Sequence, residues 1–254
     1  KITQFACSIV SLSIKRQNTG TRSESIESDS LMTAQPAWKP TADIIRLAKI
    51  THYMQYLREK RGLDFKDYDA LWQWSVDDLP AFWDSIWKYY DIRSYSAPTK
   101  ILGKRTMPGA EWFPGATLNY VDQVFRHRTS VRPAIIAGNE AGDLTPIAWA
   151  DLEQKVANLA QALRAMGLQR GDRVVAFMPN IPDTIIAFLA AASVGATWSL
   201  CSPDMGPVSV LDRFKQISPK ILFAVDGYRY GGKSFDRREV VSELQGGLPT
   251  LEKL

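Results

Sequence analysis

The chain has 254 residues, of which 45% are hydrophobic and 23% charged, as is ordinary for a globular protein with one large domain or two smaller ones. Its formal net charge of +4 is modest and is not concentrated in one run, which argues against a nucleic-acid-binding protein. The longest apolar run, IIAFLAAASVGA, is too short to cross a bilayer, so the sequence predicts no membrane span.

Cysteine and histidine are too few for a disulfide framework or a zinc site. Cys7 and Cys201 lie far apart in the chain, which is typical of a protein kept in a reducing compartment, and we expect a cytoplasmic location. His52 and His127 fall in helical patterns and belong to no cluster with metal-ligand spacing. We therefore predict no metal ligand in this chain, and the sequence leaves the oligomeric state open.

The first 31 residues differ in character from the rest. They hold seven serines and three threonines, and the serines interrupt their one apolar stretch, FACSIVSLSI. No small-residue cleavage site of a signal peptide follows that stretch. We expect residues 1–31 to be a disordered or non-native leader and the ordered protein to begin near Met32.

Residues 32–110 read as a helical extension. A helix is predicted over 41–61, with Gly62 as its C-terminal stop and with an apolar stripe made of Ile44, Ile45, Leu47, Ala48 and Leu57. A second helix is expected after WSVDDLP, where Ser75 and Asp78 have the spacing of a capping box. Its apolar face repeats at helical intervals and is interpreted as core packing: Leu79, Phe82, Trp83, Ile86, Trp87 and Tyr90. Pro and Gly residues make 93–111 a linker.

Residues 111–254 alternate between strand and helix patterns. Strands are predicted in RPAIIAG, LTPIAW, GDRVVAFMP, ATWSLCS and KILFAVD. Helices are predicted in WADLEQKVANLAQALRAMG, IPDTIIAFLAAASVG, PVSVLDRFKQIS and SFDRREVVSELQ. The pattern indicates an α/β fold with a mostly parallel sheet and helices on both faces. Ligands then dock at the carboxyl ends of the strands, near 178–180, 201–204 and 226–230.

The stretch GYRYGGKS, residues 227–234, matches the spacing of a phosphate-binding loop. A strand pattern before it and a helix pattern after it favour a nucleoside triphosphatase. Its interior argues against one, because Tyr228, Arg229 and Tyr230 are bulky and such a loop needs small residues. An ordinary strand-to-helix connection is the second interpretation.

The third interpretation comes from a resemblance. The segments EWFPGATLNYVDQVF, GLQRGDRVVAFMPNIPDTIIAFLAAASVGATWSLCSPDMG and DRFKQISPKILFAVDGYRYGGK resemble the acyl-adenylate-forming enzymes. ALWQWSVDDLPAFWDSIWKYYDI is similar to the N-terminal extension of their short-chain acid–CoA ligases. CSPDMG favours the acetoacetate branch over the acetate one, and a ligase of the acetate or propionate type is the alternative. The resemblance covers residues 36 to 254 and makes 111–254 the first part of an AMP-binding large domain.

The resemblance implies an ATP-dependent reaction that joins a short carboxylic acid, here acetoacetate, to coenzyme A and releases AMP and pyrophosphate, with Mg²⁺ beside the phosphates. It places the turn GYRYGGK against coenzyme A, so Arg229 and Lys233 are candidate contacts. Asp204 is a third candidate, weakened because the relatives have glycine there. Asn180 is expected to cap the helix that begins at Pro182. We expect Asp212 and Arg213 on a helix surface, and Trp112, Phe113 and Asn119 to pack the extension against the main domain.

No residue of the chain is a candidate for catalysis. The Ser/Thr/Gly-rich loop ending in Lys that holds the triphosphate in this family is absent from the sequence, and we expect it, with the catalytic residues, beyond residue 254. The chain is therefore expected to be the N-terminal part of a longer ligase and inactive alone. A non-catalytic truncated product is the alternative.

Overall fold

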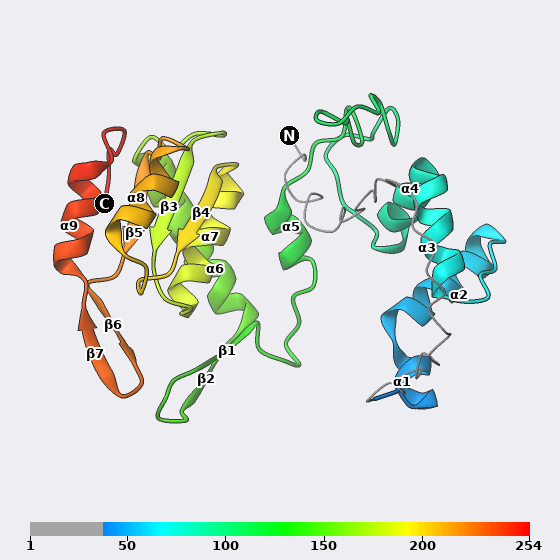
Figure 1. Cartoon of the computed structure of the whole chain (residues 1–254), viewed down its shortest axis with the longest axis horizontal. Coiled ribbons are helices and arrows are strands. Elements are labelled where there is room, and N and C mark those ends of the chain that lie inside the picture. Colours follow the sequence, from blue (N-terminus) through cyan, green and yellow to red (C-terminus); the bar gives the residue numbers. More distant parts are fainter. Residues whose placement is uncertain (1–37) are drawn as a thin grey trace, which may run out of the picture. The chain divides into compact units, whose positions relative to one another are not determined.

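The structure, a computed structural model, describes residues 38–254, and it separates the chain after Ala116 into two compact units (Figure 1). The first unit is described from residue 38 to 116 and the second from 117 to 254. The leader assigned to residues 1–31 lies outside the described residues.

The first unit is helical. Its helices are α1 (Ala42–Leu47), α2 (Lys49–Arg61), α3 (Tyr68–Asp77) and α4 (Leu79–Tyr89). The single helix predicted over 41–61 is thus two helices, because Ala48 is extended at φ −65° and ψ 138°. The Thr51 hydroxyl donates to the Ile45 carbonyl at 2.6 Å, and the Ala48 N–H donates to the same carbonyl at 3.2 Å. Gly62 ends α2 in the left-handed conformation, as predicted.

Two further predictions for this unit were wrong. Ser75 does not cap α4, because it lies inside α3, a helix that the sequence reading missed. Asp78 is itself the N-cap of α4, and its carboxylate accepts the Ala81 N–H at 3.1 Å. The apolar stripe predicted along the first helix is also only partly buried, since Leu57 is fully buried while Ile44 and Ile45 are about half exposed.

The aromatic face of α4 packs as expected. Tyr53, Leu57 and Leu71 are buried at the centre of this unit, and Phe82 and Ile86 of α4 pack against them. Other side chains of α4 extend the packing toward the following segment through two ring contacts, Trp83 with Trp112 and Trp87 with Phe113. The contacts of Trp112 and Phe113 with these rings therefore lie within the first unit. Residues 93–111, predicted as a linker, contain no regular helix or strand.

The second unit has the predicted α/β order. It contains α5 (Tyr120–Phe125), β1 (Ile135–Gly138), β2 (Leu144–Ile147), α6 (Trp149–Ala165), β3 (Arg173–Phe177), α7 (Pro182–Val194) and β4 (Thr197–Cys201). It continues with α8 (Pro207–Lys215), β5 (Ile221–Ala224), β6 (Gly227–Tyr230), β7 (Lys233–Asp236) and α9 (Arg238–Gly247). Helix α5 was not predicted, and Asn119 caps it by accepting the Val121 N–H at 2.9 Å. The Asn119 amide also donates to the Ala192 and Ser193 carbonyls of α7.

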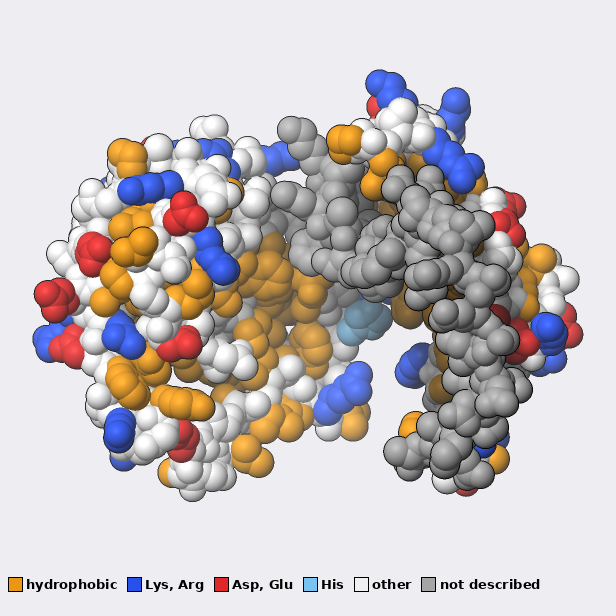
Figure 2. Space-filling view, viewed as in Figure 1, with side chains coloured by type: hydrophobic (Ala, Val, Ile, Leu, Met, Phe, Trp, Pro, Cys, Tyr) orange, Lys and Arg blue, Asp and Glu red, His pale blue; other side chains and the backbone are white. Residues whose placement is uncertain are grey.

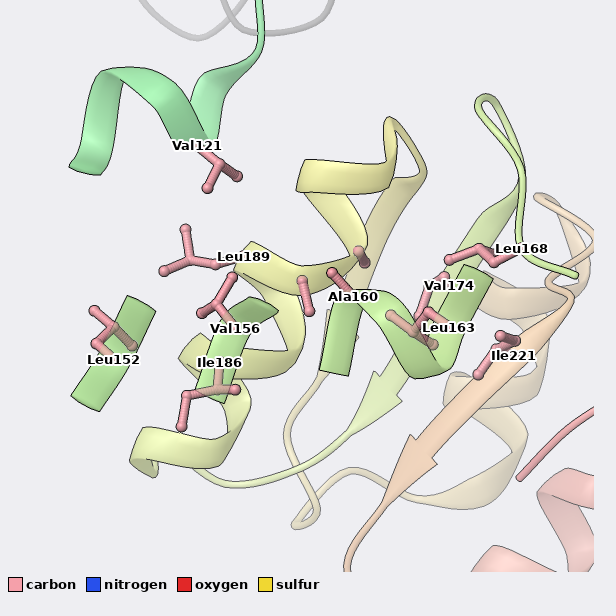
Figure 3. Close-up of a cluster of buried hydrophobic side chains, with 12 residues drawn as sticks. Val121, Leu152, Val156, Ala160, Leu163, Leu168, Val174, Ile186, Leu189 and Ile221 are labelled. Carbon is pink, nitrogen blue, oxygen red and sulfur yellow. The ribbon is translucent and has the colours of Figure 1, made fainter. Parts of the chain in front are cut away.

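Three parallel strands form the centre of this unit in the order β4-β3-β5. Helices α6 and α7 cover one face of the sheet and α8 and α9 the other (Figure 1). Figure 3 shows the first face, where side chains of α6 and α7 meet Val174 of β3 and Ile221 of β5. On the second face, Phe177 packs with Phe214 of α8 and Leu244 of α9. The predicted parallel sheet with helices on both faces is confirmed.

Two antiparallel hairpins complete the unit. Strands β1 and β2 pair around the predicted turn NEAGD, and β6 pairs with β7. Asn180 is exposed and does not cap α7, because the N-cap position is Ile181 and no side chain caps it. The Thr184 hydroxyl instead donates to the Pro179 carbonyl at 2.7 Å and closes the first turn.

The surface of the second unit carries both signs of charge. In Figure 2, Lys and Arg side chains alternate with Asp and Glu over the visible face of the second unit and do not gather in one patch. Asp212 and Arg213 of α8 are exposed, as predicted. None of the helices in residues 38–254 is both long and apolar enough to cross a membrane.

Candidate functional site: the hairpin at the carboxyl edge of the sheet

The carboxyl ends of β3, β4 and β5 lie at one edge of the sheet. The chain leaves β3 toward α7 on one face, whereas after β5 it enters the β6–β7 hairpin and then α9 on the other face. Neighbouring strands whose continuations diverge in this way form a switch point, where open α/β sheets bind ligands. The sequence positions 178–180, 201–204 and 226–230 all follow these strand ends.

The stretch GYRYGGKS is not a phosphate-binding loop. Its residues form the β6–β7 hairpin, whose two-residue turn is Gly231-Gly232 with φ of +58° and +72°. Such a loop would lead into a helix at Lys233, but Lys233 begins a strand and α9 starts only at Arg238. The predicted helix in SFDRREVVSELQ is therefore a strand followed by a shorter helix. A Gly-Gly pair between alternating aromatic residues is a hairpin signal that the sequence reading overlooked.

The pleat of the hairpin separates the two predicted contact residues. Arg229 is paired with Ser234, and Lys233 with Tyr230. Neighbouring pairs of an antiparallel ladder project to opposite faces, so Arg229 and Lys233 start from opposite faces of the hairpin. Both side chains belong to exposed residues. The structure thus brings them onto one element but not onto one surface.

The tip of the hairpin is held by a residue that the sequence reading missed. The carboxylate of Glu140, in the turn between β1 and β2, accepts hydrogen bonds from the backbone N–H groups of Gly231 and Gly232, the latter at 3.0 Å. These two bonds lower the pKa of Glu140, and the nearby charge of Arg229 lowers it further. Because consecutive N–H groups of this kind attract anions, Glu140 occupies a small anion-binding concavity and links the two hairpins.

The base of the hairpin is held by Arg237, which the sequence reading also missed. Its backbone N–H donates to the Asp226 carbonyl at 2.7 Å. Its guanidinium lies 5.2 Å from the ring centre of Tyr228 and 5.7 Å from that of Phe235, and the two rings stack on each other. Its Nη2 donates to the Tyr228 hydroxyl at 3.1 Å. Its Nε is buried and has no hydrogen-bond acceptor among residues 38–254.

Asp204 follows β4 and is exposed. Its pKa is lowered, first by a hydrogen bond from the Ser202 side chain, then by its own backbone amide, and to a smaller extent by the charge of Arg237. Asp204 is therefore an ionised group whose electrostatic neighbour on the hairpin is Arg237. Cys201, at the end of the same strand, is a buried free thiol whose pKa is raised by burial.

A shallow, open hollow of about 430 Å³ lies beside the hairpin base. Its lining consists of residues from β6, β7 and their flanks: Asp226, Gly227, Tyr228, Ser234, Phe235, Asp236 and Arg238. Asp236 and Arg238 form an ion pair there, and the guanidinium of Arg238 lowers the pKa of Asp236 to about 2. In the part of the chain that the structure describes, no three His, Cys, Asp or Glu residues are grouped so that they could hold a metal ion.

The sequence and the fold match a known family. The family model described as "AMP-binding enzyme" matches residues 122–253, slightly more than half of the chain. The chain belongs to the AMP-binding enzyme family. A second model, "Acetyl-coenzyme A synthetase N-terminus", matches residues 68–124 and includes α3 and α4. The sequence-based recognition of an adenylate-forming enzyme is thereby confirmed.

Similar proteins within this AMP-binding family include acetoacetyl-CoA synthetases. Acetoacetyl-coenzyme A synthetase of Rhizobium meliloti (strain 1021) is 38% identical over 226 residues, which are 87% of this chain and 34% of the relative. Acetoacetyl-CoA synthetase of Danio rerio is 36% identical over 90% of this chain and 34% of its own length. The solved structure of acetoacetyl-CoA synthetase from Streptomyces lividans matches with a TM-score of 0.82 and 47% identity, covering 86% of this chain and 34% of that one. The chain spans about a third of the length of these relatives.

Proposed function

We propose that this AMP-binding enzyme chain forms the N-terminal part of an ATP-dependent ligase that joins acetoacetate to coenzyme A. The products are acetoacetyl-CoA, AMP and pyrophosphate. The proposal is supported by the relatives, since acetoacetyl-CoA synthetases from bacteria and animals match nearly the whole chain. The two family-model matches, at 68–124 and 122–253, support a helical extension over 32–110 and the first part of the large domain over 111–254.

The observation that carries a coenzyme A site is the β6–β7 hairpin at the carboxyl edge of the sheet. It presents the basic side chains Arg229 and Lys233 on two paired strands. Its aromatic side chains, Tyr228 and Phe235 among them, offer surfaces on which an adenine can stack. Coenzyme A carries phosphates and an adenine, so the chemistry of the hairpin fits this substrate. We propose contacts from Arg229, Lys233 and, at the neighbouring strand end, Asp204.

ATP and Mg²⁺ are proposed for the complete ligase, because adenylation converts a carboxylate into an electrophile and a divalent cation offsets the charge of the triphosphate. No residue of this chain is assigned to the triphosphate or to the metal. A cytoplasmic location is proposed from the low cysteine content, which suits a reducing compartment.

The identity of the acid is tested by acid-dependent exchange of labelled pyrophosphate into ATP, using the complete ligase that carries this chain. We expect kcat/KM for acetoacetate to exceed those for acetate and propionate by at least about 10-fold, because a pocket built for a second carbonyl group discriminates against acids that lack it. Omission of the acid is the control. A preference for acetate or propionate would support those acids instead, and exchange with none of the three would contradict the ligase proposal.

A further inference from the structure

Arg237 is anchored more firmly than the other cationic side chains of the hairpin, yet its hydrogen-bonding capacity is not used up. Contact with the Tyr228 and Phe235 rings and the bond from Nη2 to the Tyr228 hydroxyl fix the plane of the guanidinium. A guanidinium has five N–H donors, and the buried Nε has no acceptor among the described residues. The Nε has no exposed surface, so a ligand would reach the guanidinium through its other N–H groups, which belong to a residue that is only partly buried.

The face of the hairpin on which Arg237 lies is the one that Lys233 shares. The ladder pairs Tyr228 with Phe235 and Tyr230 with Lys233, and side chains two positions apart along a strand project to the same face. Lys233 is therefore about 7 Å along β7 from Phe235, the ring beside which the Arg237 guanidinium lies. One ligand can thus reach both long cationic side chains, Lys233 and Arg237. This face combines two cations with three aromatic rings.

The opposite face of the hairpin is less suited to an anion. It carries Arg229, Ser234 and Asp236, and the charge of Arg229 already interacts with the carboxylate of Glu140. Asp236 is paired with Arg238 on that side. On the Arg237 face, the acid with a resolved electrostatic link to Arg237 is Asp204, which is exposed and forms no ion pair with it within 4.0 Å. Charge therefore favours an anion on the Arg237 face.

We propose that Arg237 binds a phosphate group of coenzyme A, together with Lys233, on the face of the hairpin formed by Tyr228, Tyr230 and Phe235. This inference rests on the proposed function and adds to it a residue that contacts the substrate directly. The planar fork of arginine suits a phosphate, and its position against two rings means that little side-chain freedom is lost on binding.

The test compares coenzyme A with pantetheine, which keeps the thiol but has no phosphate or adenine. Binding of each to the complete ligase is measured by calorimetry for wild type, Arg237→Met, Arg237→Lys and the control Arg213→Met, which changes an exposed residue of helix α8. We expect Arg237→Met to weaken coenzyme A binding by about 10-fold, the low end for a charge-assisted bond, and to leave pantetheine binding unchanged. Arg237→Lys should retain part of the affinity, and Arg213→Met all of it.

Two results of these titrations would contradict a phosphate contact by Arg237. An equal loss for both thiols in Arg237→Met would show that Arg237 only holds the hairpin together, and unchanged coenzyme A binding would show that it has no role in affinity. Hydrogen exchange over residues 226–237 verifies that the hairpin of each variant is folded. Because calorimetry needs no acid activation, a normal coenzyme A titration without pyrophosphate exchange would overturn the proposed ligase reaction and leave Arg237 assessable.

Discussion

Replacing Gly227 with alanine should open the base of the β6–β7 hairpin. An added Cβ would lie 2.6 Å from the Phe235 carbonyl oxygen, below the 3.0 Å that real Cβ contacts keep. It would also lie 3.5 Å from the Phe235 carbonyl carbon and 3.6 Å from the Asp236 Cα, so the obstacle is backbone that cannot rotate away. The two strands must therefore separate by roughly half an ångström at their first pair, Gly227 with Asp236.

The expected cost follows from overpacking and from the strained ladder. Forcing an extra carbon into a packed site costs about 1–3 kcal/mol, and we take about 2 kcal/mol for Gly227→Ala. That value raises the population of the opened hairpin by about 30-fold. Local opening limits amide exchange, so hydrogen exchange of the peptide covering residues 226–237 should accelerate by a similar factor.

The matched control is Gly246→Ala. Gly246 lies in α9, and an added Cβ there would meet no atom within 4 Å. Alanine is favoured over glycine inside a helix by about 0.5–1 kcal/mol, so this variant should exchange no faster than wild type. Equal exchange of the hairpin in Gly227→Ala, Gly246→Ala and wild type would refute the close approach of the Gly227 and Phe235 backbones.

Three further predictions concern the same unit. Replacing Glu140 with glutamine should speed exchange of the Gly231 and Gly232 amides. Since folding lowers the pKa of Glu140, the stabilisation from its two hydrogen bonds is complete above about pH 4.5 and should be lost as pH falls through the lowered pKa. NMR titration of the two glycine amides would show this loss. In the complete ligase, Lys233→Ala and Arg229→Ala should raise KM for coenzyme A, Lys233→Ala by up to about 10-fold and Arg229→Ala less, while adenylate formation is unchanged; loss of pyrophosphate exchange in either variant would revive a role in ATP binding. The 254-residue chain by itself should catalyse no acetoacetate-dependent pyrophosphate exchange, because its sequence has no Ser/Thr/Gly-rich loop ending in Lys, and turnover above a no-enzyme blank would contradict this.

Local sequence determined most of the elements in the second unit. Pro182 at the first turn of α7 and Gly195 in the left-handed conformation at its end define that helix without reference to the rest of the fold. The buried run of β3 likewise indicated a parallel strand, because a strand covered on both faces is apolar along most of its length. Where a stop signal is absent, as at Ala48 between α1 and α2, no residue pattern indicated the break.

The hairpin shows where local reading fails. The spacing of Gly227, Gly232 and Lys233 fits a phosphate-binding loop, and the same letters fit a Gly-Gly turn between two strands. Spacing alone does not distinguish the loop from the turn, because the conformation of the segment depends on which acceptors bind its backbone N–H groups. The pairing of β6 with β7 and the Glu140 carboxylate supply those acceptors here.

The sequence by itself determined the family, the α/β fold and the basic character of the turn that follows β5. Tertiary structure decided which face each basic side chain occupies, because strand pairing fixes the pleat and thus separates Arg229 from Lys233. It alone brought Arg237 onto the Tyr228 and Phe235 rings and placed Glu140 at the hairpin tip across about ninety positions of sequence. The Glu140 contact joins residues that meet only when separate elements pack, so no local pattern encodes it.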